Sequence, residues 1–147
     1  MDLSLLKSIK PDYLMAAAVL VGAFMMMKFL PRLMAGVPFV DPKAVHDMMQ
    51  SGKEVLIIDV RTPGEFTGNL GHIGGALNLE AGALASRLGD SSGQFDGLKG
   101  EPVFITCRTE NRSPRAAKML TRAGFTNVCI IKSGMAGWNR QGLPTER

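Results

Sequence analysis

Cys107 stands at a place in the sequence where a thiol could act as a nucleophile. It directly follows the apolar run Val103–Thr106, and a short polar turn separates it from a helical pattern that begins at Ser113. Such a run is typical of a parallel strand buried on both faces, which places Cys107 at the carboxyl edge of the sheet, where open α/β sheets bind ligands. Backbone N–H groups of the turn and the amino end of the helix favour an anion there, so we expect the thiolate form.

Two arginines strengthen this interpretation of Cys107. Arg108 and Arg112 lie within the polar turn and add full positive charges that favour a thiolate. The alternative is a buried structural cysteine at the end of a strand, which is what we predict for Cys129 within Val128–Ile131. A structural role for Cys107 would not require two arginines and a polar turn immediately after the sulfur.

The elements that must position Cys107 are short apolar strands that alternate with helical patterns. Runs of apolar and β-branched residues predict strands at 55–60, 76–79, Val103–Thr106 and Val128–Ile131. Helices are predicted from Pro42, with Asp41 as the N-cap, and over residues 113–123, while residues 88–100 read as a polar surface loop. This alternation predicts an α/β fold with a central parallel sheet flanked by helices.

The first part of the chain has a different composition. Residues 13–27 contain no charged side chain, and apolar residues cover every face of the helix that they would form. Continued to residue 30, this segment is ~27 Å long, close to the ~30 Å hydrocarbon core of a bilayer. We therefore expect a single-pass transmembrane helix over residues 13–30. A cleaved signal peptide ending near Ala35 and a buried core helix are the alternatives.

The sequence thus divides into an N-terminal membrane anchor with its flanks, residues 1–36, and one globular domain, residues 37–147. Lys7 and Lys10 precede the apolar segment, and slightly more basic residues follow it. This distribution, together with an unpaired reactive thiol, favours a domain on the cytoplasmic side of the membrane.

Some classes of function find no support in the composition. The net charge is +4, but no basic stripe with interleaved aromatic residues is present, so nucleic-acid binding is not expected. The two cysteines and the two histidines, His46 and His72, show no metal-ligand spacing, so neither a metal nor another cofactor is expected.

Three motifs occur in order along the chain, and the third begins with the Cys107 turn. Residues 56–66 read Leu-Ile-Ile-Asp-Val-Arg-Thr-Pro-Gly-Glu-Phe, and residues 71–78 read Gly-His-Ile-Gly-Gly-Ala-Leu-Asn. The Cys107 turn is followed by Gly-Met-Ala-Gly-Trp at 134–138 and Gly-Leu-Pro at 142–144. Together these stretches resemble the rhodanese family over about residues 37–144, the whole globular part.

The resemblance implies a sulfurtransferase. Cys107 would take sulfane sulfur from a donor, such as thiosulfate or a protein or low-molecular-weight persulfide, hold it as a persulfide, and pass it to a thiol acceptor. The turn would bind the substrate and the persulfide through Arg108, Thr109, Glu110, Asn111, Arg112 and Ser113. Arg112 is the expected charge partner of the sulfur.

The same resemblance gives structural roles to neighbouring residues. Asp59 and Arg61 would form a structural pair, His72 would pack and hydrogen-bond at a turn, and Trp138 would fill the core. Glu110 stands where active members often have glycine. Its negative charge is expected to weaken anionic donors, which favours a protein-borne persulfide.

Three rival functions compete with sulfur transfer. A related phosphatase or arsenate reductase needs a wider loop than the four residues that separate Cys107 from Arg112. A non-catalytic, membrane-tethered protein-binding module would usually lack the cysteine. Redox sensing would need the Cα atoms of Cys107 and Cys129 within ~7 Å, and their placement on different strands argues against it.

Overall fold

The computed structural model describes residues 11–90 and 93–147. The chain divides into two compact units, with the boundary between Met34 and Ala35. Lys7 and Lys10, used above to orient the chain in a membrane, lie outside the described residues, as do positions 91–92 of the expected polar loop.

The second unit is built on a parallel five-stranded sheet. Its strands are β1 (Phe39–Val40), β2 (Leu56–Asp59), β3 (Leu77–Asn78), β4 (Val103–Thr106) and β5 (Val128–Ile131), in the spatial order β1-β5-β4-β2-β3. Every pairing is parallel, which confirms the predicted α/β fold with a central parallel sheet. β1 was expected only as extended chain, and it becomes an edge strand by pairing with β5.

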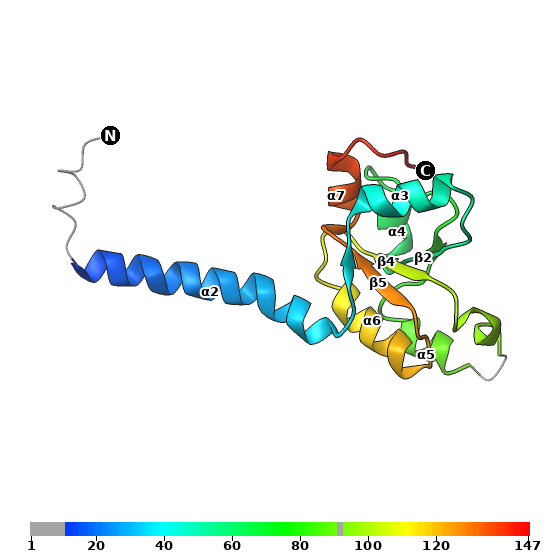
Figure 1. Cartoon of the computed structure of the whole chain (residues 1–147), viewed down its shortest axis with the longest axis horizontal. Coiled ribbons are helices and arrows are strands. Elements are labelled where there is room, and N and C mark those ends of the chain that lie inside the picture. Colours follow the sequence, from blue (N-terminus) through cyan, green and yellow to red (C-terminus); the bar gives the residue numbers. More distant parts are fainter. Residues whose placement is uncertain (1–10, 91–92) are drawn as a thin grey trace. The chain divides into compact units, whose positions relative to one another are not determined.

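Helices cover both faces of this sheet (Figure 1). On one face lie α3 (Pro42–Gln50) and α7 (Gly134–Arg140), and on the other α5 (Leu84–Leu88) and α6 (Ser113–Arg122). Two buried apolar clusters fill the spaces between helices and sheet. Trp138 is fully buried in the cluster beneath α3 and α7, and Phe125 is buried in the cluster beneath α5 and α6.

Local sequence signals set the helix starts. The side chain of Asp41 accepts a hydrogen bond from the Lys43 N–H at 3.0 Å, so it is the N-cap that the sequence predicted for α3. The short helix α4 (Pro63–Phe66) begins with a capping box, in which Thr62 and Glu65 each satisfy the backbone N–H of the other. A 3₁₀-helix, Asp96–Leu98, occupies part of the region expected to be an irregular loop.

The first unit contains α2 (Pro11–Ala35) except for Ala35, and the large apolar side chains of residues 13–33 are exposed. No helix within residues 11–90 and 93–147 combines the length and the apolarity needed to cross a membrane. The structure therefore does not support the transmembrane helix expected over residues 13–30.

Candidate active site

Cys107 occupies the predicted position at the carboxyl edge of the sheet. It directly follows β4, and its residue is only 1% exposed. Thr106 pairs with Asp59 at the end of β2, so the Cys107 turn and the turn after β2 leave the sheet side by side. The motif that follows β2 and the motif that follows β4 therefore meet at the carboxyl edge of the sheet, because the carboxyl ends of parallel strands lie at one edge.

The amino end of α7 holds the Cys107 turn in place. The Met135 N–H donates to the Cys107 carbonyl at 2.8 Å, and the Ala136 N–H donates to the Arg108 carbonyl at 2.9 Å. Gly134 has a φ of +54°, and a Cβ atom built there would lie 2.3 Å from the Cys107 carbonyl oxygen. Only glycine permits this close approach of α7 to the turn.

Four backbone N–H groups of the turn have no hydrogen-bond acceptor in the described part of the chain. They belong to Arg108, Thr109, Asn111 and Arg112. In a planar trans peptide the C=O and the N–H point in opposite directions. Because the carbonyls of Cys107 and Arg108 face α7, the next two N–H groups face away from it. Successive amides without an intramolecular partner are a feature of anion-binding nests.

Arg112 makes a bidentate ion pair with Glu65 of α4. Its Nη1 and Nη2 atoms each lie 2.7 Å from a carboxylate oxygen of Glu65. The hydrogen bonds from Arg112 lower the pKa of Glu65 to about 2. The pKa of Arg112 is raised, mainly by Glu65 and less by the charges of Cys107 and Asp59. Arg112 was expected as the charge partner of the sulfur, and the structure pairs it with a carboxylate near that sulfur.

Glu110 turns its carboxylate toward the amino end of α7. It accepts a hydrogen bond from the Ser133 N–H, which adds a third link between the turn and α7. Its φ is 157°, in the range that glycine adopts more readily than other residues. Glu110 stands where many family members have glycine, and its carboxylate makes a hydrogen bond that a glycine could not make.

Asp59 and Arg61 form a buried ion pair. Asp59 Oδ2 lies 2.6 Å from Arg61 Nη2, and both side chains are almost fully buried. Arg61 also donates to the carbonyl oxygens of Glu65 and Gly71, so it ties β2 to α4 and to the turn before β3. These contacts join three segments of the chain, and the purely structural role that the resemblance implied stays a prediction.

His72 packs within the same turn. Its ring stacks on Phe66 with centroids 3.8 Å apart, and its Nδ1 lies 3.1 Å from the Phe66 carbonyl oxygen. Its backbone pairs with that of Glu146 near the end of the chain. These contacts are packing and a hydrogen bond at a turn, and the structural role of His72 stays a prediction.

The remaining residues of the turn fall into two groups. The side chains of Thr109 and Asn111 are exposed. Ser113 is fully buried, and its hydroxyl has no hydrogen-bond partner among the described residues. Within that same part of the chain, no three His, Cys, Asp or Glu side chains gather closely enough to hold a metal ion.

Cys129 is remote from Cys107. It pairs with Phe104, three residues before Cys107 on the neighbouring strand, which puts the two cysteines roughly 11 Å apart at ~3.3 Å per residue and ~4.8 Å between strands. Both thiols are free, and burial raises the pKa of Cys129. A disulfide between them would need closer Cα atoms.

Two residues of the site could not be assigned a role from the sequence alone. Glu65 carries the carboxylate that binds Arg112, and Gly134 lets α7 reach the turn. The Thr-Pro-Gly-Glu pattern at 62–65 does predict a capping box. It does not reveal a partner 47 positions away.

The fold and site define an α/β domain with a buried cysteine at the carboxyl edge of a parallel sheet, followed by a short polar turn. The rhodanese-like domain family matches residues 41–141. Thiosulfate sulfurtransferase 16 of Arabidopsis thaliana is 36% identical over 107 residues, which cover 69% of this chain and 86% of that protein. The rhodanese-like domain of an Anabaena protein, solved by NMR, is similar with a TM-score of 0.62 and 28% identity, covering 74% of this chain and 78% of that one. This chain belongs to the rhodanese-like domain family.

An uncharacterized protein of Synechocystis, slr1261, is 34% identical over 104 residues. These cover 71% of this chain but only 53% of the Synechocystis protein. The chain therefore spans about half the length of that curated relative.

Proposed function

We propose that the protein is a sulfurtransferase that carries sulfur as a Cys107 persulfide. The observation that carries the proposal is the set of free N–H groups in the turn that follows the buried Cys107. These dipoles stabilise a thiolate and, after loading, a terminal persulfide anion. A relative named as a thiosulfate sulfurtransferase supports the same chemistry.

The reaction needs no group beyond the chain and its two substrates. With thiosulfate as donor, the Cys107 thiolate attacks the outer sulfur and forms a new S–S bond. The S–S bond of thiosulfate breaks, and sulfite leaves with the electron pair. A thiolate acceptor then attacks the outer sulfur of the persulfide, and the Cys107 thiolate leaves.

A persulfide serves as a better donor than thiosulfate, and it loads Cys107 by the same displacement, with the donor thiolate as the leaving group. Glu65 neutralises Arg112, and Glu110 adds a carboxylate to the turn, so the full charges that would attract a dianion are reduced. A persulfide on a protein or a small thiol carries less charge than thiosulfate and depends less on such attraction.

Intact mass spectrometry of the full-length protein tests the proposal. After incubation with thiosulfate or a low-molecular-weight persulfide, we expect a gain of one sulfur atom in the wild type and in Cys129→Ser, but none in Cys107→Ser. Two oxygen atoms add nearly the same mass, so cyanide or dithiothreitol must remove the adduct. If no donor loads the folded protein, the proposal fails, and a non-catalytic protein-binding module becomes the better interpretation.

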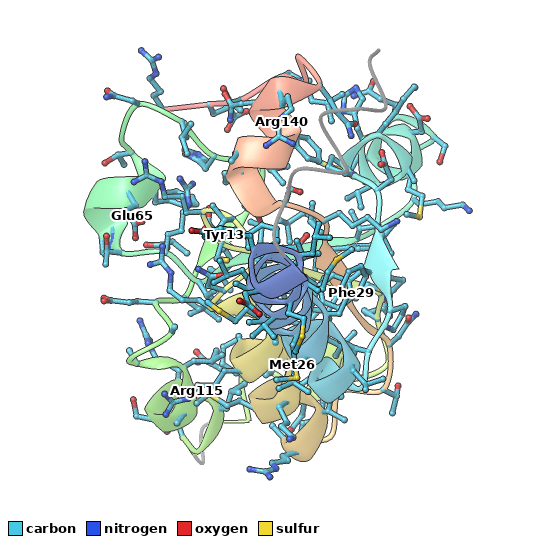
Figure 2. All side chains as sticks on the ribbon, turned by 90° about the vertical axis from the view of Figure 1, so that its left-hand side faces the viewer. Tyr13, Met26, Phe29, Glu65, Arg115 and Arg140 are labelled. Atoms are coloured by element: carbon cyan, nitrogen blue, oxygen red, sulfur yellow. The ribbon has the colours of Figure 1, made fainter. Side chains whose placement is uncertain are left out.

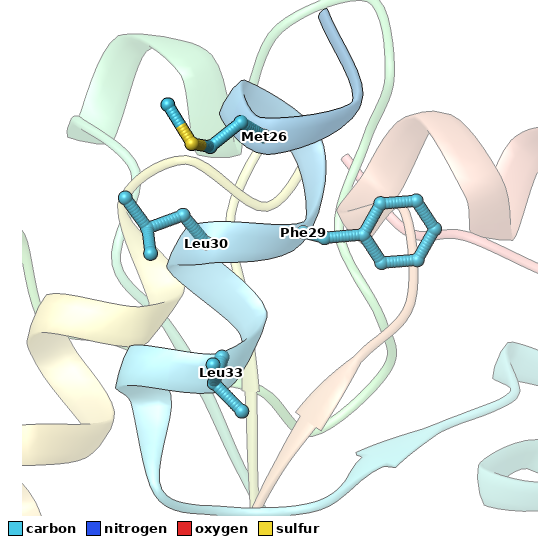
Figure 3. A pocket seen from close by; sticks show the side chains of 4 residues that line it. All are labelled: Met26, Phe29, Leu30 and Leu33. Carbon is cyan, nitrogen blue, oxygen red and sulfur yellow. The ribbon is translucent and has the colours of Figure 1, made fainter. Parts of the chain in front are cut away.

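We further propose that residues 13–30 associate with a lipid bilayer and that the domain lies on the cytoplasmic side. The apolar side chains of this part of α2 are exposed, among them Val19, Leu20 and Phe24. Figure 3 shows Met26 and Leu30 on one side of the helix and Phe29 on the other, so the apolar surface is not a single stripe.

Cell fractionation followed by protease protection tests this second proposal. Sedimentation with membranes is expected for the wild type and is expected to weaken in a Leu20→Asp, Phe24→Asp double variant. Recovery of the wild type in the supernatant would contradict the proposal.

A further inference from the structure

A cavity opens beside the Cys107 turn. It has a volume of about 200 Å³ and is lined by α4, by residues 68–70 and by the side chains of Arg61 and Arg108. Arg108 directly follows Cys107, so its Cα lies about 3.8 Å from that of Cys107 across a trans peptide. The cavity is therefore lined by a residue next in sequence to Cys107.

The charges around the cavity leave one positive charge uncompensated. Asp59 neutralises Arg61, and Arg112 neutralises Glu65. Arg108 is exposed, and its guanidinium forms no ion pair or hydrogen bond with any residue in 11–90 or 93–147. An arginine in this state suits a planar carboxylate, which it can bind through two parallel N–H groups.

A second donor lines the same cavity. The Nη1 atom of Arg61 has two N–H groups and donates one hydrogen bond, to the Glu65 carbonyl oxygen at 2.9 Å. One N–H of this almost fully buried guanidinium therefore lacks an acceptor in the described part of the chain. A buried donor without a partner indicates a site for a ligand acceptor or an ordered water.

We propose that this cavity binds the carboxylate of the sulfur acceptor, a low-molecular-weight thiol that carries an acidic group, and that Arg108 determines this specificity. The inference rests on the proposed persulfide function of Cys107. The carboxylate pairs with Arg108, and the acceptor thiolate attacks the outer persulfide sulfur. The new S–S bond joins that sulfur to the acceptor, and the Cys107 thiolate leaves with the electron pair of the broken bond.

The test compares three acceptor thiols that differ in charge. Full-length protein is loaded with sulfur and its discharge is followed by intact mass with 3-mercaptopropionate, 2-mercaptoethanol and cysteamine. Arg108→Ala is expected to lower the ratio of the carboxylate rate to the neutral rate by about 1.4-fold to fivefold, the range for an ion pair open to solvent. Arg108→Glu is expected to shift the preference toward cysteamine, and high salt to reduce the wild-type preference.

Arg115→Ala is the matched control. Arg115 is an exposed arginine of α6 outside the cavity, and Figure 2 shows it well away from Glu65. The control is expected to keep the wild-type ratio. An unchanged ratio in Arg108→Ala would overturn the inference, and so would an equal loss with all three thiols. A defect confined to loading from thiosulfate would also overturn it, because the cavity would then serve the donor.

A binding measurement separates this inference from the sulfurtransferase proposal. In unloaded protein, the NMR resonance of the Arg108 Nε–H is expected to shift with 3-mercaptopropionate but not with 2-mercaptoethanol. The absence of a shift would refute the carboxylate site even if sulfur transfer were established. A shift in a protein that loads no sulfur would support the site and reject the proposed chemistry.

Discussion

The ion pair between Glu65 and Arg112 gives a prediction that can be worked out in magnitude. Glu65→Gln keeps the size of the side chain and removes its charge, so Arg112 loses its partner while the turn after Cys107 stays intact. The pKa of Glu65 is lowered from 4.5 to about 2. At ~1.36 kcal/mol for each pKa unit, this shift sets an upper bound of about 3.4 kcal/mol.

Solvent reduces the contribution of the Glu65–Arg112 ion pair to stability below this upper bound. The side chains of Arg112 and Glu65 are 36% and 29% exposed, so water and salt screen the pair. We expect Glu65→Gln to lower the free energy of unfolding by about 1–2 kcal/mol at neutral pH. Because the folded-state pKa of Glu65 is depressed, its contribution is present above about pH 4.5. It is lost as the pH falls toward the folded pKa of about 2.

Urea unfolding of the full-length wild type and Glu65→Gln at several pH values measures this effect. The difference between the two proteins is expected to fall to less than half of its neutral value by about pH 3. Glu80→Gln serves as control, because Glu80 is exposed and has no ion pair among the described residues. A difference that stays constant from pH 7 to pH 3 would refute the assignment of this energy to the Glu65 charge.

Three other substitutions probe the scaffold. Asp59→Asn leaves Arg61 buried without its counter-charge and is expected to cost about 3–5 kcal/mol in urea unfolding, whereas a cost below 1 kcal/mol would contradict the buried pair. Gly134→Ala would force its Cβ against the Cys107 carbonyl, so we expect a fall in melting temperature together with loss of sulfur loading. His72→Gln is expected to keep the loading rate within about threefold, since a general base typically contributes at least 100-fold. A larger loss would make His72 catalytic.

The sequence predicted those parts of the fold that depend on local patterns. The apolar runs of β4 and β5 are buried on both faces, so they read as parallel strands, and the position of Cys107 after β4 follows directly. Asp41 was recognisable as an N-cap because its hydrogen bond is local. The two-residue strand β1 was not recognisable, since its pairing with β5 depends on tertiary contacts.

Contacts between distant segments account for what the sequence missed at the site. The sequence predicted Arg112 as the charge partner of the sulfur. Nothing in the turn around Arg112 indicates that α4 supplies a carboxylate that pairs with it. Glu110 read as a charge beside the sulfur for the same reason, although its carboxylate bonds to the Ser133 N–H. The apolar content of residues 13–30 suggested a membrane-spanning helix, and no described helix meets the requirement for one.

The pairing of charges around Cys107 indicates which groups would stabilise an anion at its sulfur. With Arg61 and Arg112 both paired with carboxylates, the proposed stabilisation of a Cys107 anion rests chiefly on the N–H groups of the turn that have no partner in the described part of the chain. These dipoles are fixed by β4, α6 and α7, so they stabilise an anion without reorganising during the reaction. Changes of exposed charge, as at Arg108, should therefore alter which substrates are used. Changes of backbone geometry, as at Gly134, should remove the ability to carry sulfur at all.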